Sequence, residues 1–216
     1  MRLASDTFAA VVGDDLVLLQ TGRDRYLCLP GAAAKLRLGS DGKGFATADG
    51  ELAKILSSVA IVQTSGRAPM DPAPRPAMRP CRDRPLSAPG ARPADIWRLT
   101  CAVLDLSRGY LMRPLGPILG FARRSNAGLP PPSVDPELIR LAAVFDRLAP
   151  WLPISGKCLV RSFVLLRFLQ RSGRDADWVF GVRVWPFSAH CWLQVGDMAL
   201  DDHADRLRAY EPILAA

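Results

Sequence analysis

The middle of the chain is unusually rich in proline. Residues 66–94 hold eight prolines and six arginines, with almost no bulky apolar side chains among them. Proline has no backbone N–H and disfavours helix at the residue before it, so this stretch cannot stay in a helix or sheet for long. We therefore predict a semi-rigid linker between two domains, residues 1–65 and 95–216. The alternative is a long ordered surface loop, although structureless loops beyond about 15 residues are uncommon inside compact domains.

Length and composition indicate a folded chain. It has 216 residues, 49% of them apolar and 23% charged, which excludes an acidic disordered tail and a collagen-like chain. Arg161 and Arg167 interrupt one of the longest apolar runs, residues 158–169, and no stretch approaches the roughly 20 apolar residues that a bilayer span needs. The N-terminus lacks the apolar core of a signal peptide, so we expect a cytoplasmic protein.

Residues 1–65 have the pattern of a small antiparallel sheet. Three short β-type runs are separated by turn signals rich in glycine and aspartate. The runs span residues 8–12, 16–20 and 26–29. Leu52, Ile55 and Leu56 then share one face of a predicted helix. This part contains no histidine and is too small for a deep active site, so we interpret it as a binding module.

The C-terminal part has helical patterns first and strand patterns afterwards. Helices are predicted over residues 94–106, from Asp135 onward with proline and acid in the first turn, and from Ser155-Gly156 to Gly173. Only strand signals follow. They cover residues 178–185, 189–195, 198–202 and 207–210. Helices followed by an antiparallel sheet predict an α+β fold.

One of the five cysteines occupies a distinctive place. The odd number and the absence of a CxxC pair argue against a disulfide framework or a zinc knuckle. Cys158 is predicted in the first helical turn, two or three residues past a cap at Ser155 or Gly156. Unpaired N–H groups, the helix dipole and Lys157 favour a thiolate there, and the same amides can donate to an oxyanion. Cys158 is thus a candidate nucleophile; the alternative is a buried structural cysteine.

Two histidines, His190 and His203, are available as a general base. His190 stands near the start of a predicted strand, and the next strand ends in Asp201-Asp202. A three-residue turn at 195–197 places His190 directly opposite Asp202, whereas a two-residue turn brings Asp201 to that face. Either carboxylate can orient an imidazole that deprotonates a thiol.

A metal site is the competing chemistry in this segment. The side chains that could bind a metal are His190, Cys191, Asp201, Asp202 and His203. Adjacent strand residues point to opposite faces, so His190 and Cys191 cannot easily bind one ion. We therefore expect no metal, and we expect Cys191 and His203 to be bystanders. No phosphate-binding glycine motif is present, so we expect neither ATP nor another cofactor on this chain.

Three motifs together resemble a known family. They are Gly156-Lys157-Cys158-Leu159, Ala189-His190-Cys191-Trp192-Leu193-Gln194 and Leu200-Asp201-Asp202. In order and spacing they are similar to the B proteins of lasso-peptide biosynthesis, the transglutaminase-like, papain-type cysteine proteases that remove leader peptides. The resemblance covers the chain from about residue 95 and implies that Cys158 is the nucleophile, His190 the general base and Asp202 its orienter. The family commonly has a small residue at the position of Cys191, which should point away from the triad.

The N-terminal part resembles the leader-recognition element of the same systems. The resemblance rests on Asp15-Leu16-Val17-Leu18-Leu19 and on Gly22-Arg23-Asp24-Arg25-Tyr26-Leu27-Cys28-Leu29-Pro30. It implies a winged-helix-like module, a three-stranded antiparallel sheet with short helices, to whose edge a leader peptide adds as an extra strand. The candidate leader contacts are Leu16, Leu18, Tyr26, Leu27 and Leu29. The linker then raises the effective concentration of the cleavage site at the peptidase.

The resemblance also implies partners. They are the precursor peptide, a separate asparagine-synthetase-like cyclase that uses ATP, and an export transporter at the membrane. The net charge of +7 suits an acidic partner, but the arginines are dispersed over the linker and both domains, so we expect no nucleic acid. Two other functions stay open. One is a transglutaminase or amidase in which an amine intercepts the acyl-enzyme, and the other is a non-catalytic adaptor that binds peptide or nucleic acid.

Overall fold

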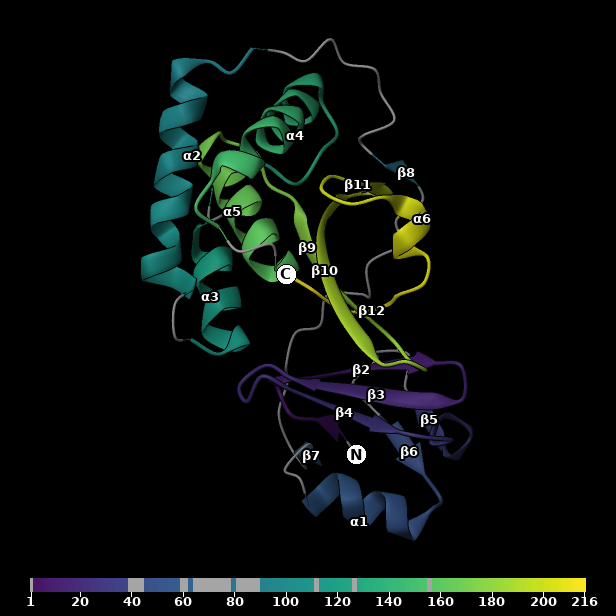
Figure 1. The fold of residues 1–216 in the computed structure, drawn as a ribbon. Coiled ribbons are helices and arrows are strands. Elements are labelled where there is room, and N and C mark those ends of the chain that lie inside the picture. The colour runs from purple at the N-terminus through teal and green to yellow at the C-terminus, as the bar shows by residue number, and fades with distance from the viewer. Residues whose placement is uncertain are drawn as a thin grey trace.

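The computed structural model contains two main sheets and a group of helices (Figure 1). It describes residues 2–38, 45–58, 62–63, 79–80, 90–110, 113–125, 128–154 and 157–216. Most of the predicted linker, residues 66–94, lies outside this part of the chain. No helix in the described ranges is long and apolar enough to cross a membrane.

The N-terminal sheet is the predicted three-stranded meander. Its strands are β2 (Thr7–Val12), β3 (Asp15–Gln20) and β4 (Arg25–Leu29), antiparallel in the order β2-β3-β4. Gly13 allows the tight β2–β3 turn because its φ is +61°. All six residues of β3 are buried, since both faces of the sheet are covered. Leu16 and Leu18 face one core, and Val17 and Leu19 face the other.

Helix α1 (Gly50–Ser58) packs beneath this sheet. The Asp49 carboxylate begins the helix by accepting the N–H groups of Glu51 and Leu52 at 3.0 and 3.1 Å. Leu52 and Leu56 are buried, but Ile55, predicted on the same face, is 46% exposed. Short strand pairs complete this region. They are β1 (Arg2–Leu3) with β7 (Val62–Gln63) and β5 (Leu36–Leu38) with β6 (Phe45–Thr47).

Four α-helices of the C-terminal part lie among the described residues between 93 and 171. They are α2 (Pro93–Asp105), which continues into a π-helical turn (Leu106–Tyr110), α3 (Leu115–Ser125), α4 (Pro136–Leu148) and α5 (Cys158–Arg171). The predicted start at Asp135 is confirmed, because its carboxylate accepts the Leu138 N–H at 2.7 Å. Helix α5 is buried along most of its length and packs on α2 and β10. Its first turn is therefore held firmly against the sheet.

The C-terminal sheet has the strand order β12-β9-β10-β11-β8. Its strands are β9 (Asp177–Arg183), β10 (Ser188–Val195), β11 (Met198–Ala199), β12 (Glu211–Ala215) and β8 (Arg79–Pro80). Helices and a mainly antiparallel sheet confirm the α+β class. The predicted strand at 207–210 is wrong: Ala204 and Leu207, three residues apart, bury one side of the short helix α6 (Ala204–Leu207), and the strand begins only at 211.

The N-terminal sheet packs directly on the C-terminal region (Figure 1). Strand β2 lies against β12 and β9, and Val17 and Leu19 join the same hydrophobic core as α5. Polar contacts connect the two parts as well: the Gly116 N–H donates to the Thr21 carbonyl at 2.9 Å, and the Trp185 indole donates to Asp15 at 2.7 Å. The N-terminal module is thus held by a shared core.

Candidate active site

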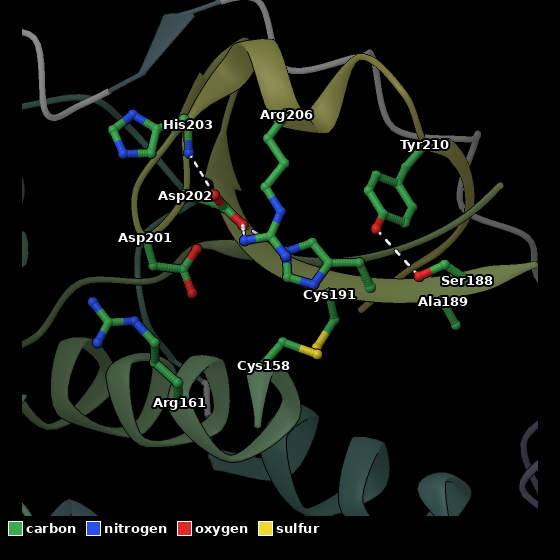
Figure 2. Close-up of a pocket in the computed structure, with 11 residues that line it drawn as sticks. Cys158, Arg161, Ser188, Ala189, Cys191, Asp201, Asp202, His203, Arg206 and Tyr210 are labelled. Carbon is green, nitrogen blue, oxygen red and sulfur yellow. Dashed lines mark hydrogen bonds and ion pairs between the residues drawn. The ribbon is translucent and has the colours of Figure 1, made fainter. Parts of the chain in front are cut away.

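Cys158 is the first residue of α5, so it stands where backbone N–H groups have no partner within the helix. Lys157 is the N-cap residue, in an extended conformation; Ser155 and Gly156, the predicted caps, lie outside the described residues. Three apolar neighbours in the helix, Val160, Phe163 and Val164, are buried and fix the direction of this turn. The helix start therefore presents the Cys158 thiol beside β10 (Figure 2).

His190 lies on β10, buried except for 9% of its surface. Its ring packs against those of Trp192 and Tyr210, with centroid distances of 6.1 and 5.4 Å. Across the ladder its partner is Gly181, where an added Cβ would lie 2.7 Å from the Trp192 ring. The glycine thus leaves room for the aromatic side chain that supports the imidazole.

Asp202 contacts the imidazole directly: its Oδ2 is 2.6 Å from His190 Nε2. Of the two turns considered for this segment, the shorter one is present. The β10–β11 turn has two residues, Gly196 and Asp197, because Val195 pairs with Met198. Glycine at φ +60° allows the tighter turn.

The chain leaves the ladder just before the two aspartates. Strand β11 ends at Ala199, and the last ladder contact joins the Leu200 N–H to the Leu193 carbonyl at 2.9 Å. Asp201 then accepts the Leu193 N–H at 2.9 Å, while Asp202 turns toward His190. The structure therefore brings His190 together with Asp202, even though the register is the one expected to favour Asp201.

The charged forms of Asp202, His190 and Cys158 stabilise one another. Burial disfavours the Asp202 anion, but hydrogen bonds from His190 and the His203 N–H lower its pKa below the usual value. Burial likewise disfavours a charged His190, yet contacts with Asp202 and Cys158 raise its pKa to about 9. Because Nε2 is hydrogen-bonded to Asp202, Nδ1 is the ring nitrogen that remains for the hydrogen bond with Cys158. The imidazole is accordingly positively charged at neutral pH.

Cys158 is the matching anion. Hydrogen bonds from the Cys191 thiol and the His190 ring, assisted by the Cys191 N–H, lower its pKa to about 4 against the opposing effect of burial. Between about pH 4 and pH 9 the two side chains form a thiolate–imidazolium pair. Such a pair supplies a nucleophile and an acid that can protonate a leaving amine.

Comparison with known proteins identifies the family of this chain. Residues 101–215, just over half of the chain, match the transglutaminase-like superfamily. The chain belongs to this superfamily. It is also 42% identical over 45 residues to the microcin J25-processing protein McjB of Escherichia coli, a match that covers 21% of this chain and 22% of that protein. The match thus spans about a fifth of either chain. None of the solved structures matches.

The prediction that Cys191 points away from the other site residues is wrong for this transglutaminase-like chain. Cys191 and Trp192 do point to opposite faces of β10, as alternation requires. However, α5 packs on the Cys191 face, so the helix start places Cys158 against Cys191. Figure 2 shows the two cysteine side chains directed toward one another. His203 is exposed; its backbone N–H donates to Asp202 at 2.7 Å.

A cavity of about 480 Å³ opens beside the thiol (Figure 2). Ser188, Ala189 and Tyr210 line one part of it, and Arg161 and Arg206 line another. None of these five side chains was predicted from the sequence as part of the site. For Arg161 the sequence held a signal, because this residue stands three positions after Cys158 in the predicted helix and so lies on the same side of it. Arg206 lies on α6, a helix that the sequence pattern did not predict. In the described ranges no three His, Cys, Asp or Glu side chains gather as a metal site requires.

The predicted leader contacts are divided between the two faces of the N-terminal sheet. Leu16 and Leu18 are 3% and 1% exposed and belong to the small core above α1. Leu27 and Leu29 are half-buried against the same core. Tyr26 points to the other side, where its ring lies 5.6 Å from that of Phe187 in the β9–β10 turn. Of the five, Tyr26 is thus the residue on the side of the cavity.

Proposed function

We propose that this chain is a cysteine peptidase that removes the leader segment from a lasso-peptide precursor. The observation that carries the proposal is the Cys158–His190–Asp202 group, with a thiolate at a helix start and an imidazolium beside it. Membership of the transglutaminase-like superfamily and the local similarity to the microcin J25-processing protein support the choice of substrate.

The chemistry follows from the arrangement. The Cys158 sulfur bonds to the carbonyl carbon of the last leader residue, and the carbonyl electrons move to oxygen, where N–H groups at the start of α5 can donate. The C–N bond then breaks as the His190 Nδ1 proton passes to the leaving amine. Water next loses a proton to His190 and attacks the acyl-enzyme, which releases the leader carboxylate and restores the Cys158 thiolate. Asp202 holds the ring through Nε2 in both steps.

The leader is proposed to bind at the outer edge of β4. The other edge of the N-terminal sheet is β2, which faces β12 and β9, whereas β4 has no strand partner on its outer side among the described residues. An extended peptide can add to such an edge through main-chain hydrogen bonds. The half-buried Leu27 and Leu29 lie on this strand and can contact the peptide. Leu16 and Leu18 would act only by supporting the sheet.

Contacts between the two parts suggest a path from this edge to the thiol. Tyr26 on β4 packs at a tilt against Phe187, and the two residues after Phe187, Ser188 and Ala189, line the cavity beside Cys158. Burial raises the pKa of Tyr26, and the charges of Cys191, Asp24 and Cys158 add to that shift. A bound leader would therefore run over the β9–β10 turn toward the nucleophile.

The test uses the purified full chain and a lasso-peptide precursor as the substrate. The unaltered protein should release a core peptide with a new N-terminus and, in ¹⁸O-labelled water, a leader labelled at its C-terminus. Cys158→Ala should abolish cleavage and retain leader binding, whereas Cys101→Ala on α2 should cleave normally. Cleavage by Cys158→Ala at the original rate would refute the assignment. An unlabelled leader joined to an added amine would instead establish the acyltransferase alternative.

A further inference from the structure

A second thiol lies against the proposed nucleophile. Cys191 follows His190 on β10, is only 4% exposed, and lines the same cavity as Cys158. Figure 2 shows its side chain and that of Cys158 directed toward one another, and neither is in a disulfide. The proposed peptidase mechanism gives Cys191 no task. Its placement beside the reacting sulfur calls for a physical account.

Ser162, one helical turn after Cys158, determines whether the Cys191 thiol donates or accepts a hydrogen bond. Its hydroxyl accepts the Trp178 indole N–H at 2.9 Å and donates to the Cys158 carbonyl at 2.8 Å. The single hydroxyl proton is thereby committed to the carbonyl, although Ser162 Oγ also lies 3.4 Å from Cys191 Sγ. Cys191 must then act as the donor, either to the hydroxyl oxygen or to the Cys158 sulfur.

The charge on Cys158 decides between these two acceptors. An anionic acceptor forms a stronger hydrogen bond than a neutral hydroxyl, so the Cys191 S–H turns to the thiolate once it forms. The backbone N–H of Cys191 contacts the same sulfur. The hydrogen bond with Cys158 disfavours ionisation of Cys191 itself, as do burial and the charge of the neighbouring thiolate, so the pKa of Cys191 is raised. Cys191 thus stays protonated and remains a donor while Cys158 is charged.

We propose that Cys191 is a positioning residue of the active site, whose thiol donates a hydrogen bond to the Cys158 sulfur and holds it ionised and aimed into the cavity. This inference rests on the proposed function only in taking Cys158 as the nucleophile. A cysteine that merely fills the core would affect stability and leave the ionisation of Cys158 unchanged. The two roles are therefore separable by experiment.

Alkylation by iodoacetamide tests the role without any peptide substrate. The rate of Cys158 modification, followed by peptide mass spectrometry from pH 3 to pH 10, reports its ionisation. In Cys191→Ala the midpoint should rise by about one pH unit or more, because the thiolate loses a donor. Cys191→Ser should restore much of the shift through its O–H group, and Cys101→Ala should behave as the unaltered protein. Equal midpoints in folded Cys191→Ala and unaltered protein would overturn the proposal.

A measurement on the unaltered chain covers the case in which Cys191→Ala does not fold. Diamide takes up two hydrogen atoms from neighbouring thiols, which lose two S–H bonds and form one S–S bond. It should join Cys158 to Cys191, with loss of two hydrogen masses and of alkylation at Cys158, and dithiothreitol should reverse both. Failure to form this disulfide would refute the contact. If the unaltered protein fails to cleave the precursor, but Cys191→Ala still shows the higher midpoint of alkylation, only the peptidase proposal is refuted.

Discussion

Contacts among His190, Asp202 and Cys158 determine the pH range in which the ion pair exists. Asp202 and Cys158 together raise the pKa of His190 to about 9 against the effect of burial, and the imidazolium in turn helps to lower the pKa of Cys158 to about 4. The reactive ion pair forms above the lower value, as the thiol loses its proton, and is lost above the higher one, as the ring loses its own. Activity should therefore form a broad plateau between these limits.

Replacement of Asp202 by asparagine tests this coupling. Without the anion, the imidazolium is less stable, so the alkaline limb should move to lower pH and the acid limb to higher pH. We expect kcat/KM at neutral pH to fall by about 100-fold or more. The pH profile of precursor cleavage measures both effects.

Asp201→Asn is the matched control for this change. Asp201 is buried and accepts the Leu193 N–H instead of contacting His190, so its replacement should change the profile less. A larger loss in Asp201→Asn than in Asp202→Asn would reverse the assignment.

Among the helices and strands, local patterns were predictable and long-range placements were not. The β2–β3–β4 meander follows from short apolar runs and from turn residues such as Gly13, and Asp135 marks the start of α4. The segment at 207–210 has apolar spacing compatible with either element, and burial of Leu207 selects a helix. Cys191 was misplaced because strand alternation says nothing about which face a helix covers.

The position of α5 depends on a buried carboxylate that no sequence pattern indicated. Asp105 on α2 is 2% exposed and accepts hydrogen bonds from Arg167 at 2.9 Å and from two nitrogens of Arg171 at 3.1 and 2.9 Å. These contacts join α2 to the helix that carries Cys158 at its start. They hold the C-terminal end of α5 and so help to position Cys158 at its start.

Asp105→Ala should therefore destabilise the protein. It leaves the buried Arg167 without its carboxylate partner, which costs about 3–5 kcal/mol when a buried ion pair is broken. Urea unfolding measures the loss. As a control, Asp205→Ala removes an exposed pair with Arg208 and should cost less than about 1 kcal/mol. Equal effects of the two substitutions would contradict the role given to Asp105.

In the whole molecule, the packing of the N-terminal sheet against the C-terminal region could not be predicted from the sequence. The prolines predict a linker between the two parts. The hydrogen bond between Trp185 and Asp15, however, joins residues 170 positions apart, and no local sequence pattern predicts it. Val17 and Leu19, fully buried in the core that includes α5, strengthen the same attachment. These contacts hold the N-terminal module at one distance from Cys158, whereas a linker alone would allow a range of distances.

A fixed module makes the spacing within the leader important. Removal of three residues between the segment bound at β4 and the scissile bond shortens the extended peptide by about 10 Å, which a docked module cannot follow. Cleavage should fall by about tenfold or more, whereas leader affinity, measured by fluorescence anisotropy, should stay the same. The same deletion at the leader's N-terminal end is the control and should leave cleavage unchanged. Full cleavage of the internally shortened precursor would mean that the module moves with the peptide, and that the shared core opens during turnover.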